Sequence, residues 1–174
     1  MHINSVVQYL YHSYILEARI MSDYIMDLRK IVGHRPLLQV GASVIVVDSS
    51  DRVLLQFRSD HRCWGYSGGS VELDEVVEDA AKRELFEETG LIAGKLELFG
   101  VFSGPDTHNI YPNGDEVSNV DIVYICREYS GTLKCQIGEV EDLRFFALSE
   151  IPEHIFPANR PALYKWINLN NADA

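Results

Sequence analysis

The spacing of hydrophobic and polar residues changes along the chain, and these changes predict its elements. Through residues 4–31 the apolar positions recur at helical spacing, which predicts a long N-terminal helix. Gly33 and Pro36 then supply the signals that typically end a helix. We therefore expect residues 1–35 to form a helical extension that precedes the main domain.

After this extension the chain reads mostly as strands separated by turns. Apolar runs rich in β-branched residues at 37–47 and 53–58 flank a short polar turn, and this arrangement predicts a hairpin. The segment 103–117 has no apolar period and is expected to be a long loop. Further strands are expected at residues 95–102, 118–127 and 142–148.

Residues 75–89 have the strongest helical pattern in the chain. Asp74 is placed as the N-cap of this helix, and Gly90 suits the left-handed position after its last turn. A closing helix is expected directly after Asn159, which we favour as its N-cap. Strands, a helix, more strands and a closing helix predict an α+β domain with a mixed sheet over residues 36–170.

Composition narrows the classes of protein that fit this pattern. The chain has 174 residues, 47% hydrophobic and 24% charged, which is typical of a globular domain. The formal net charge of −11 disfavours duplex nucleic acid and anionic membranes as partners. No window is apolar enough for a membrane span, and three widely spaced cysteines do not predict a disulfide framework. We expect a cytoplasmic protein.

Three glutamates share one face of the predicted 75–89 helix. Glu84, Glu87 and Glu88 are spaced i, i+3 and i+4, so they lie within an arc of roughly 100°. Ala80 and Ala81 occupy the same arc one turn earlier, which is the face expected to pack on the sheet. Like charges at this spacing repel, and Mg²⁺ or Mn²⁺ removes the repulsion. The alternative is a solvated acidic face.

The sequence around this helix favours the metal site. Gly68 and Gly69 allow a backbone to approach a ligand closely, and Arg83 stands beside Glu84. Residues 72–88 hold eight acidic and two basic residues, so more than half of the net negative charge lies in this segment. Bound cations would invert its local sign and admit a small phosphate-bearing ligand.

The segment 69–91 resembles the Nudix box. That pattern is a glycine, five residues, a glutamate, seven residues, Arg-Glu, an aliphatic residue, any residue, Glu-Glu, any residue, glycine and an aliphatic residue. The matching positions are Gly69, Glu75, Arg83, Glu84, Leu85, Glu87, Glu88, Gly90 and Leu91. Looser similarity extends over about residues 37–167, so the first 35 residues lie outside it.

This resemblance implies an α/β/α sandwich that hydrolyses a nucleoside diphosphate linked to another group X. It implies that Glu84, Glu87, Glu88 and the carbonyl of Gly69 bind Mg²⁺ or Mn²⁺, and that Arg83 holds Glu84 in place. The metals would neutralise the diphosphate and lower the pKa of the attacking water. Glu75, the remaining box glutamate, is usually peripheral to the metals.

The resemblance also implies functional residues outside the box. The general base is often a glutamate on a later loop, which makes Glu139 and Glu141 candidates and Glu116 a third. Arg58 matches a position where some members contact a phosphate. For each of these residues the alternative is a charged side chain on the surface.

Signals for the substrate are weaker. Ser67 replaces the proline that many members have before the box. Asn159 resembles an asparagine that contacts the purine base in MutT-type enzymes, although the N-cap interpretation is favoured. Tyr111 on the long polar loop could stack a base. The expected substrate is a small nucleotide: a nucleoside triphosphate, ADP-ribose or a nucleotide sugar.

Two other functions stay open. One is a pyrophosphohydrolase acting on RNA 5′ ends, which the acidic balance disfavours. The other is a non-catalytic nucleotide-sensing module, although such modules usually lose metal glutamates and this box is intact. The apolar stripe of the N-terminal helix needs cover, from the domain or from a partner in a homodimer.

Overall fold

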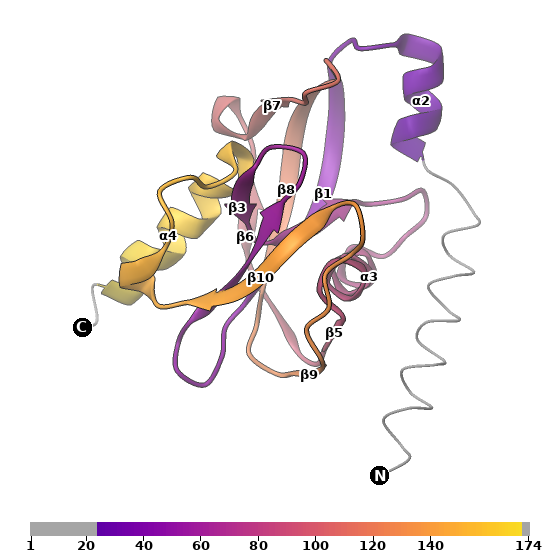
Figure 1. Cartoon of the computed structure of the whole chain (residues 1–174). Coiled ribbons are helices and arrows are strands. Elements are labelled where there is room, and N and C mark those ends of the chain that lie inside the picture. Colours follow the sequence, from indigo (N-terminus) through magenta and orange to yellow (C-terminus); the bar gives the residue numbers. More distant parts are fainter. Residues whose placement is uncertain (1–23, 172–174) are drawn as a thin grey trace.

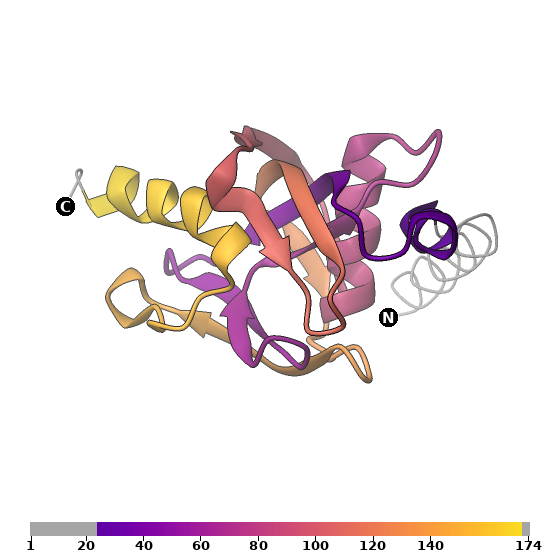
Figure 2. The ribbon, with the colours of Figure 1, turned by 90° about the horizontal axis from the view of Figure 1, so that it is seen from above.

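The computed structural model describes residues 24–171, in which a central mixed sheet lies between two helices (Figures 1 and 2). The strand order is β4-β1-β8-β6, with β7 also paired to β8. β1 runs parallel to β8, and the other pairs are antiparallel. The strands are β1 (Leu37–Val46), β4 (Ser67–Ser70), β6 (Leu96–Phe102), β7 (His108–Ile110) and β8 (Glu116–Cys126).

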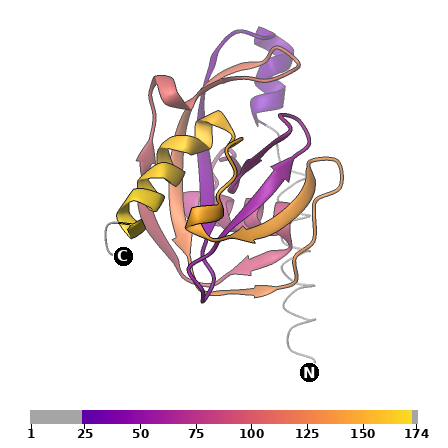
Figure 3. The same cartoon turned by 60° about the vertical axis from the view of Figure 1, so that its left-hand side comes forward.

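A second sheet lies in front of the central one in Figures 1 and 3. It has the order β10-β2-β3, and the short strands β5 and β9 form a separate pair. These strands are β2 (Val53–Arg58), β3 (Cys63–Gly65), β5 (Leu91–Ala93), β9 (Tyr129–Gly131) and β10 (Val140–Phe146). The remaining elements are the helices α2 (Tyr24–Val32), α3 (Val77–Thr89) and α4 (Arg160–Asn171), and 3₁₀ turns at Pro105–Thr107, Leu148–Glu150 and Pro157–Asn159.

The two large helices cover opposite faces of the central sheet (Figure 2). α3 packs through Ala80, Ala81 and Leu85 in a fully buried cluster that includes Val44 of β1. Small side chains let the helix approach the strands closely, as the apolar pattern of its sequence predicts. α4 packs through residues such as Leu163 in a second cluster. The expected α/β/α sandwich is confirmed.

β1 contributes to both faces because successive side chains of a strand point in opposite directions. Ala42 and Val44 belong to the cluster under α3, whereas Ile45 belongs to the cluster under α4. Gly41 and Ser43, on the same side of the strand as Ile45, line a cleft. One face of β1 therefore packs against α3, and the opposite face forms the floor of the cleft.

The hairpin predicted over residues 37–58 is wrong. β1 pairs with β4 and β8, while β2 pairs with β10 and β3, and a single bridge between Val47 and Val53 joins the two strands. Both edges of β1 are already occupied, so the chain reverses at the polar turn and enters another sheet. The polar residues between β1 and β2 do form a turn, but a turn does not determine which strand the next strand pairs with.

Two further expectations need correction. The segment 103–117 is not all loop, because it contains a 3₁₀ turn and β7, which pairs with β8. Asp74 is not the N-cap of α3, since Val76 holds that position without a side-chain cap and Asp74 has a positive φ of 62°. Gly90 does end the helix in the left-handed conformation, with φ of 73°.

α2 is fixed to the domain by one buried arginine. Arg29, 8% exposed, donates hydrogen bonds to the carbonyl oxygens of Gly33 (3.1 Å), Arg35 (2.6 Å) and Glu116 (2.6 Å). Its Nε also lies 3.4 Å from a carboxyl oxygen of Asp115. The part of the N-terminal prediction before residue 24 lies outside the described residues. Within residues 24–171, no helix combines the length and apolarity needed to cross a bilayer.

Candidate active site

A cleft of about 260 Å³ lies where β1, β4 and β8 meet the segment before α4. It brings together predicted site residues from six separate parts of the chain. Its lining is formed by Gln39, Gly41, Ser43, Arg58, Tyr66, Gly68, Gly69, Ser70, Glu84, Glu88, Tyr111, Asn119, Asp121, Glu139, Phe156, Ala158 and Asn159.

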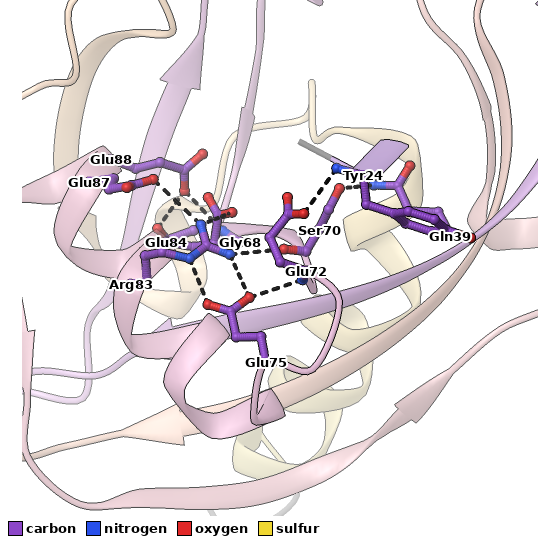
Figure 4. Close-up of polar contacts among 11 residues, drawn as sticks. Tyr24, Gln39, Gly68, Ser70, Glu72, Glu75, Arg83, Glu84, Glu87 and Glu88 are labelled. Atoms are coloured by element: carbon purple, nitrogen blue, oxygen red, sulfur yellow. Dashed lines mark hydrogen bonds and ion pairs between the residues drawn. The ribbon is translucent and has the colours of Figure 1, made fainter. Parts of the chain in front are cut away.

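Glycines let the end of α3 approach β4. A Cβ on Gly69 would overlap the carboxylate of Glu84, and a Cβ on Gly68 would overlap the hydroxyl of Ser43. The segment around these glycines is the edge strand β4, which pairs with β1. Glu84 and Glu88, which line the cleft, are thereby placed against the backbone of β4, and Figure 4 shows them beside Gly68.

Glu88 is the most deeply buried of the three box glutamates, with 5% of its surface exposed. One of its carboxyl oxygens accepts hydrogen bonds from the Ser67 hydroxyl (2.5 Å) and the Gly68 amide (2.9 Å). Burial raises its pKa above the ordinary value. Burial, together with the negative charge of Glu88, raises the pKa of Glu84 to about 8.

Arg83 connects the carboxylates at the start and the end of the box (Figure 4). Its guanidinium donates two hydrogen bonds to Glu75, at 2.8 and 2.9 Å, and one to Glu84 at 2.6 Å. It also donates to the carbonyl of Ser70 and lies 3.5 Å from a carboxyl oxygen of Glu87. Such a bidentate clamp fixes the side chains around one planar cation.

The contacts continue from Glu75 to α2. A carboxyl oxygen of Glu75 accepts the backbone N–H of Glu72 at 3.0 Å. A carboxyl oxygen of Glu72 accepts the backbone N–H of Tyr24 at 3.0 Å, where α2 begins (Figure 4). The start of α2 is thus joined through three charged side chains to Glu84.

The donor set suits a hard divalent cation. Glu84 and Glu88 present carboxylate oxygens at Gly68 and Gly69, and Mg²⁺ and Mn²⁺ prefer oxygen ligands. Burial disfavours the charged form of both carboxylates, and a cation would stabilise that form. Among residues 24–171, no three His, Cys, Asp or Glu side chains already converge as a complete ligand group. Glu87 lies beside Arg83 and outside the cleft lining.

Of the three predicted general bases, Glu139 alone lines the cleft. Glu141, in β10, forms an exposed ion pair with Arg62. Glu116 lies 3.2 Å from the Nε2 atom of His108. The backbone of Glu139 is held at the end of β2, where its carbonyl accepts the N–H of Ser59.

Arg58 and Tyr111 lie at the cleft with partners of their own. Arg58 donates to both carboxyl oxygens of Asp60, at 3.1 and 2.8 Å, and its guanidinium stands over the ring of Phe156. Although burial acts against its charge, Asp60 holds the Arg58 pKa above its ordinary value. Tyr111 packs edge-on against His61, with ring centroids 5.3 Å apart.

Asn159 does not cap the closing helix through its side chain. Its Oδ1 atom is buried without a hydrogen-bond partner, whereas an N-cap oxygen would accept a backbone N–H. The residue is 8% exposed, and its Oδ1 atom lies against Gly65, where a Cβ would overlap it. The amide therefore belongs to the cleft lining, and the N-cap interpretation is wrong.

The structure adds three residues that sequence reasoning did not place together. Ser43 and Tyr66 donate their hydroxyls to the two carboxyl oxygens of Asp121, at 2.7 and 3.0 Å. All three are buried and line the cleft, and burial raises the pKa of Asp121. The local signal that could have found this group is Asp121 itself, an acidic residue placed directly before the apolar run that ends β8.

Comparison with known proteins identifies the fold and the box. A family model described as the NUDIX domain matches residues 37–167. The chain belongs to the NUDIX family. Membership identifies it as a hydrolase acting on acid anhydrides in phosphorus-containing compounds, and the matched range coincides with the sandwich and excludes α2.

Relatives within the NUDIX family carry names of nucleotide hydrolases. The "ADP-ribose pyrophosphatase" of Methanocaldococcus jannaschii is 35% identical over 139 residues, 78% of this chain and 78% of that protein. The "Putative 8-oxo-dGTP diphosphatase" of Bacillus subtilis is 43% identical over 65 residues, 37% of this chain and 44% of that protein. The chain thus matches less than half of the second relative.

Solved NUDIX structures share the sandwich. The crystal structure of a MutT NUDIX hydrolase from Burkholderia pseudomallei superposes with a TM-score of 0.63 at 31% sequence identity. The match covers 74% of this chain and 97% of that one. Nearly the whole of that protein therefore corresponds to a part of this chain.

Proposed function

We propose that this NUDIX protein is a metal-dependent pyrophosphohydrolase of small nucleotides. It cleaves a nucleoside diphosphate linked to another group X and releases a nucleoside monophosphate. The observation that carries this proposal is the placement of Glu84 and Glu88, both buried and with raised pKa values, against Gly68 and Gly69 at one cleft. A site of this kind requires a cation, and a diphosphate is the ligand that such cations bind.

The residues of the box would divide the work as follows. Glu84, Glu87, Glu88 and the carbonyl of Gly69 would hold Mg²⁺ or Mn²⁺, which polarises a phosphorus and acidifies a bound water. Arg83 holds Glu84 through its fork while Glu75 fixes the opposite side of the guanidinium. Glu139, at the cleft, would accept the proton of the attacking water.

Arg58, Tyr111 and Asn159 would bind the substrate. Arg58 carries a positive charge at the cleft and would contact a phosphate, in competition with Asp60. Tyr111 presents an aromatic ring to the same cleft. The free Oδ1 atom of Asn159 would accept a hydrogen bond from a base. A homodimer and a cytoplasmic setting also stay predictions.

ADP-ribose is the first substrate to test, because the relative named for its hydrolysis matches most of this chain. Nucleoside triphosphates come second, since the MutT structure shares the whole sandwich. A cleft of about 260 Å³ is smaller than the usual range for a whole drug-sized ligand, so it would enclose a part of the nucleotide.

The deciding experiment is a substrate panel with controlled metal. Purified protein would be assayed with ADP-ribose, nucleotide sugars, ordinary and oxidised nucleoside triphosphates and RNA 5′ ends, in Mg²⁺, Mn²⁺ or EDTA. We expect turnover in either metal and none in EDTA. Glu88→Gln should lower kcat by about two orders of magnitude or more, because a metal ligand is lost. Glu78→Gln, an exposed change on the same helix, should have no effect.

The panel also tests the alternatives. Preference for RNA 5′ ends would favour the RNA pyrophosphohydrolase function over that of a small-nucleotide hydrolase. Nucleotide binding without metal-dependent turnover of any substrate would contradict the catalytic proposal and favour a nucleotide-sensing module.

A further inference from the structure

The group Ser43–Asp121–Tyr66 lies in the cleft but has no part in the metal chemistry proposed above. Asp121 reaches the cleft from β8, whereas the box glutamates reach it from α3 across β4. A Cβ atom on Gly41 of β1 would lie 3.4 Å from a carboxyl oxygen of Asp121 and 3.5 Å from the carbonyl oxygen of Gly69. The single strand β1 therefore separates the Asp121 carboxyl on β8 from the Gly69 carbonyl on β4, which is the proposed backbone ligand of the metal.

The fold alone gives little reason for this carboxyl. Val123, two residues further on the same face of β8, is fully buried in the apolar cluster under α4. Burying a carboxyl there is unfavourable unless hydrogen bonds compensate, and apolar side chains of similar shape would pack without that penalty. Tyr66 likewise carries a buried hydroxyl, which donates a hydrogen bond to Asp121. A ligand that uses these polar groups would offset the penalty of burying them.

The hydrogen bonds within this group leave some acceptor positions of Asp121 unused. Each carboxyl oxygen of Asp121 accepts one hydroxyl, and a carboxylate has about four acceptor positions, so two remain. Asn159, which lines the same cleft, adds an Oδ1 atom that is more than nine-tenths buried and has no partner. Asp121 and Asn159 both line the cleft, so a ligand that donates hydrogen bonds is favoured on this side of it.

We propose that Asp121 is a specificity-determining residue that accepts a hydrogen bond from an amino group of the nucleobase. The class of substrate is then a nucleotide of adenine, guanine or cytosine, and a base whose amino group is replaced by oxygen is disfavoured. Ser43 and Tyr66 act as positioning residues that hold the carboxyl toward the cleft. This proposal rests on the proposed function for its choice of a nucleotide as the ligand.

The test measures binding and needs no turnover. The affinities of AMP, GMP, IMP and 2′-deoxy-AMP would be measured in EDTA for the full chain and for Asp121→Asn. IMP has an oxygen where AMP has its amino group and lacks the amino group of GMP. We expect AMP or GMP to bind the full chain at least about 10-fold more tightly than IMP, and Asp121→Asn to lose most of that preference. Asp106→Asn, the same change at an exposed position, should keep it.

Three results would contradict the proposal. An unchanged preference in Asp121→Asn, or equal losses for AMP, GMP and IMP, would make Asp121 a structural residue. A preference that follows the 2′-hydroxyl would assign the carboxyl to the ribose. If Asp121→Asn does not fold, Tyr66→Phe, which removes one of the two hydroxyls, must reduce the same preference. Selective binding without hydrolysis would keep this subsite while overturning the proposed function.

Discussion

The carboxylate of Glu84 occupies the space that a side chain on Gly69 would need. Gly69→Ala should therefore move β4 and the end of α3 apart and lower kcat/KM by about 100-fold, comparable to the loss of a metal ligand. The control is Ser118→Ala on β8. A second glycine such as Gly114 does not serve as the control, because its positive φ would strain an alanine by itself. The assay is initial-rate kinetics in Mg²⁺, and activity retained by Gly69→Ala would contradict the close approach.

The metal-free protein should lose stability as the pH rises from about 4.5 to about 8. Burial and Glu88 raise the pKa of Glu84 from 4.5 to about 8, so the unfolded chain releases this proton first. Within that window the unfolded state binds fewer protons, and the free energy of unfolding falls with pH. Above the folded-state pKa the loss is complete.

Thermal unfolding in EDTA between pH 5 and 8.5 measures this effect. Glu84→Gln cannot ionise and should show a flatter Tm profile, while Mg²⁺ should raise the Tm of the unmodified protein most at high pH. Parallel profiles for the two proteins would show that the general negative charge, and not Glu84, sets the pH dependence.

Glu139→Gln should lower kcat by about 100-fold with little change in KM, if Glu139 is the general base. Glu141→Gln, two residues away and paired with Arg62, is the matched control and should leave kcat nearly unchanged. The pH–rate profile should also lose its acidic limb in Glu139→Gln alone. Equal effects of the two changes would remove Glu139 from the reaction.

Arg29→Ala should destabilise the domain by about 2–4 kcal/mol, because three carbonyl oxygens lose a charged donor and Asp115 loses its partner. Chemical denaturation measures this difference. Arg35→Ala removes an exposed arginine from the same segment and should change stability by no more than about 0.5 kcal/mol. A small effect of Arg29→Ala would mean that α2 is dispensable for folding.

Periodicity predicted the long elements well because each one shows its buried face locally. α3, β1 and β8 were placed within a few residues of their observed bounds, since their apolar patterns are long and regular. β4 has the sequence Ser67–Ser70 with two central glycines, which has no strand preference of its own. It is a strand because the edge of β1 is free to pair with it, and that is a property of the assembled sheet.

The same distinction holds in the cleft. The spacing of Glu84 and Glu88 on one helix face indicated a shared site from sequence alone, and the structure places both at the cleft. Ser43 and Asp121 are 78 residues apart, and only the parallel pairing of β1 with β8 brings them together. The misplaced hairpin concealed this pairing, because it assigned an edge of β1 to β2.

The alternation of β1 ties the chemistry of this protein to its folding. Ala42 and Val44 pack against α3, while the alternate residues Gly41 and Ser43 line the cleft. A single inserted or deleted residue would exchange the two sets, pointing Ser43 into the core and a bulky side chain at the cleft floor. The length of this strand, and not only the identity of its residues, is therefore as much a part of the site as the glutamates are.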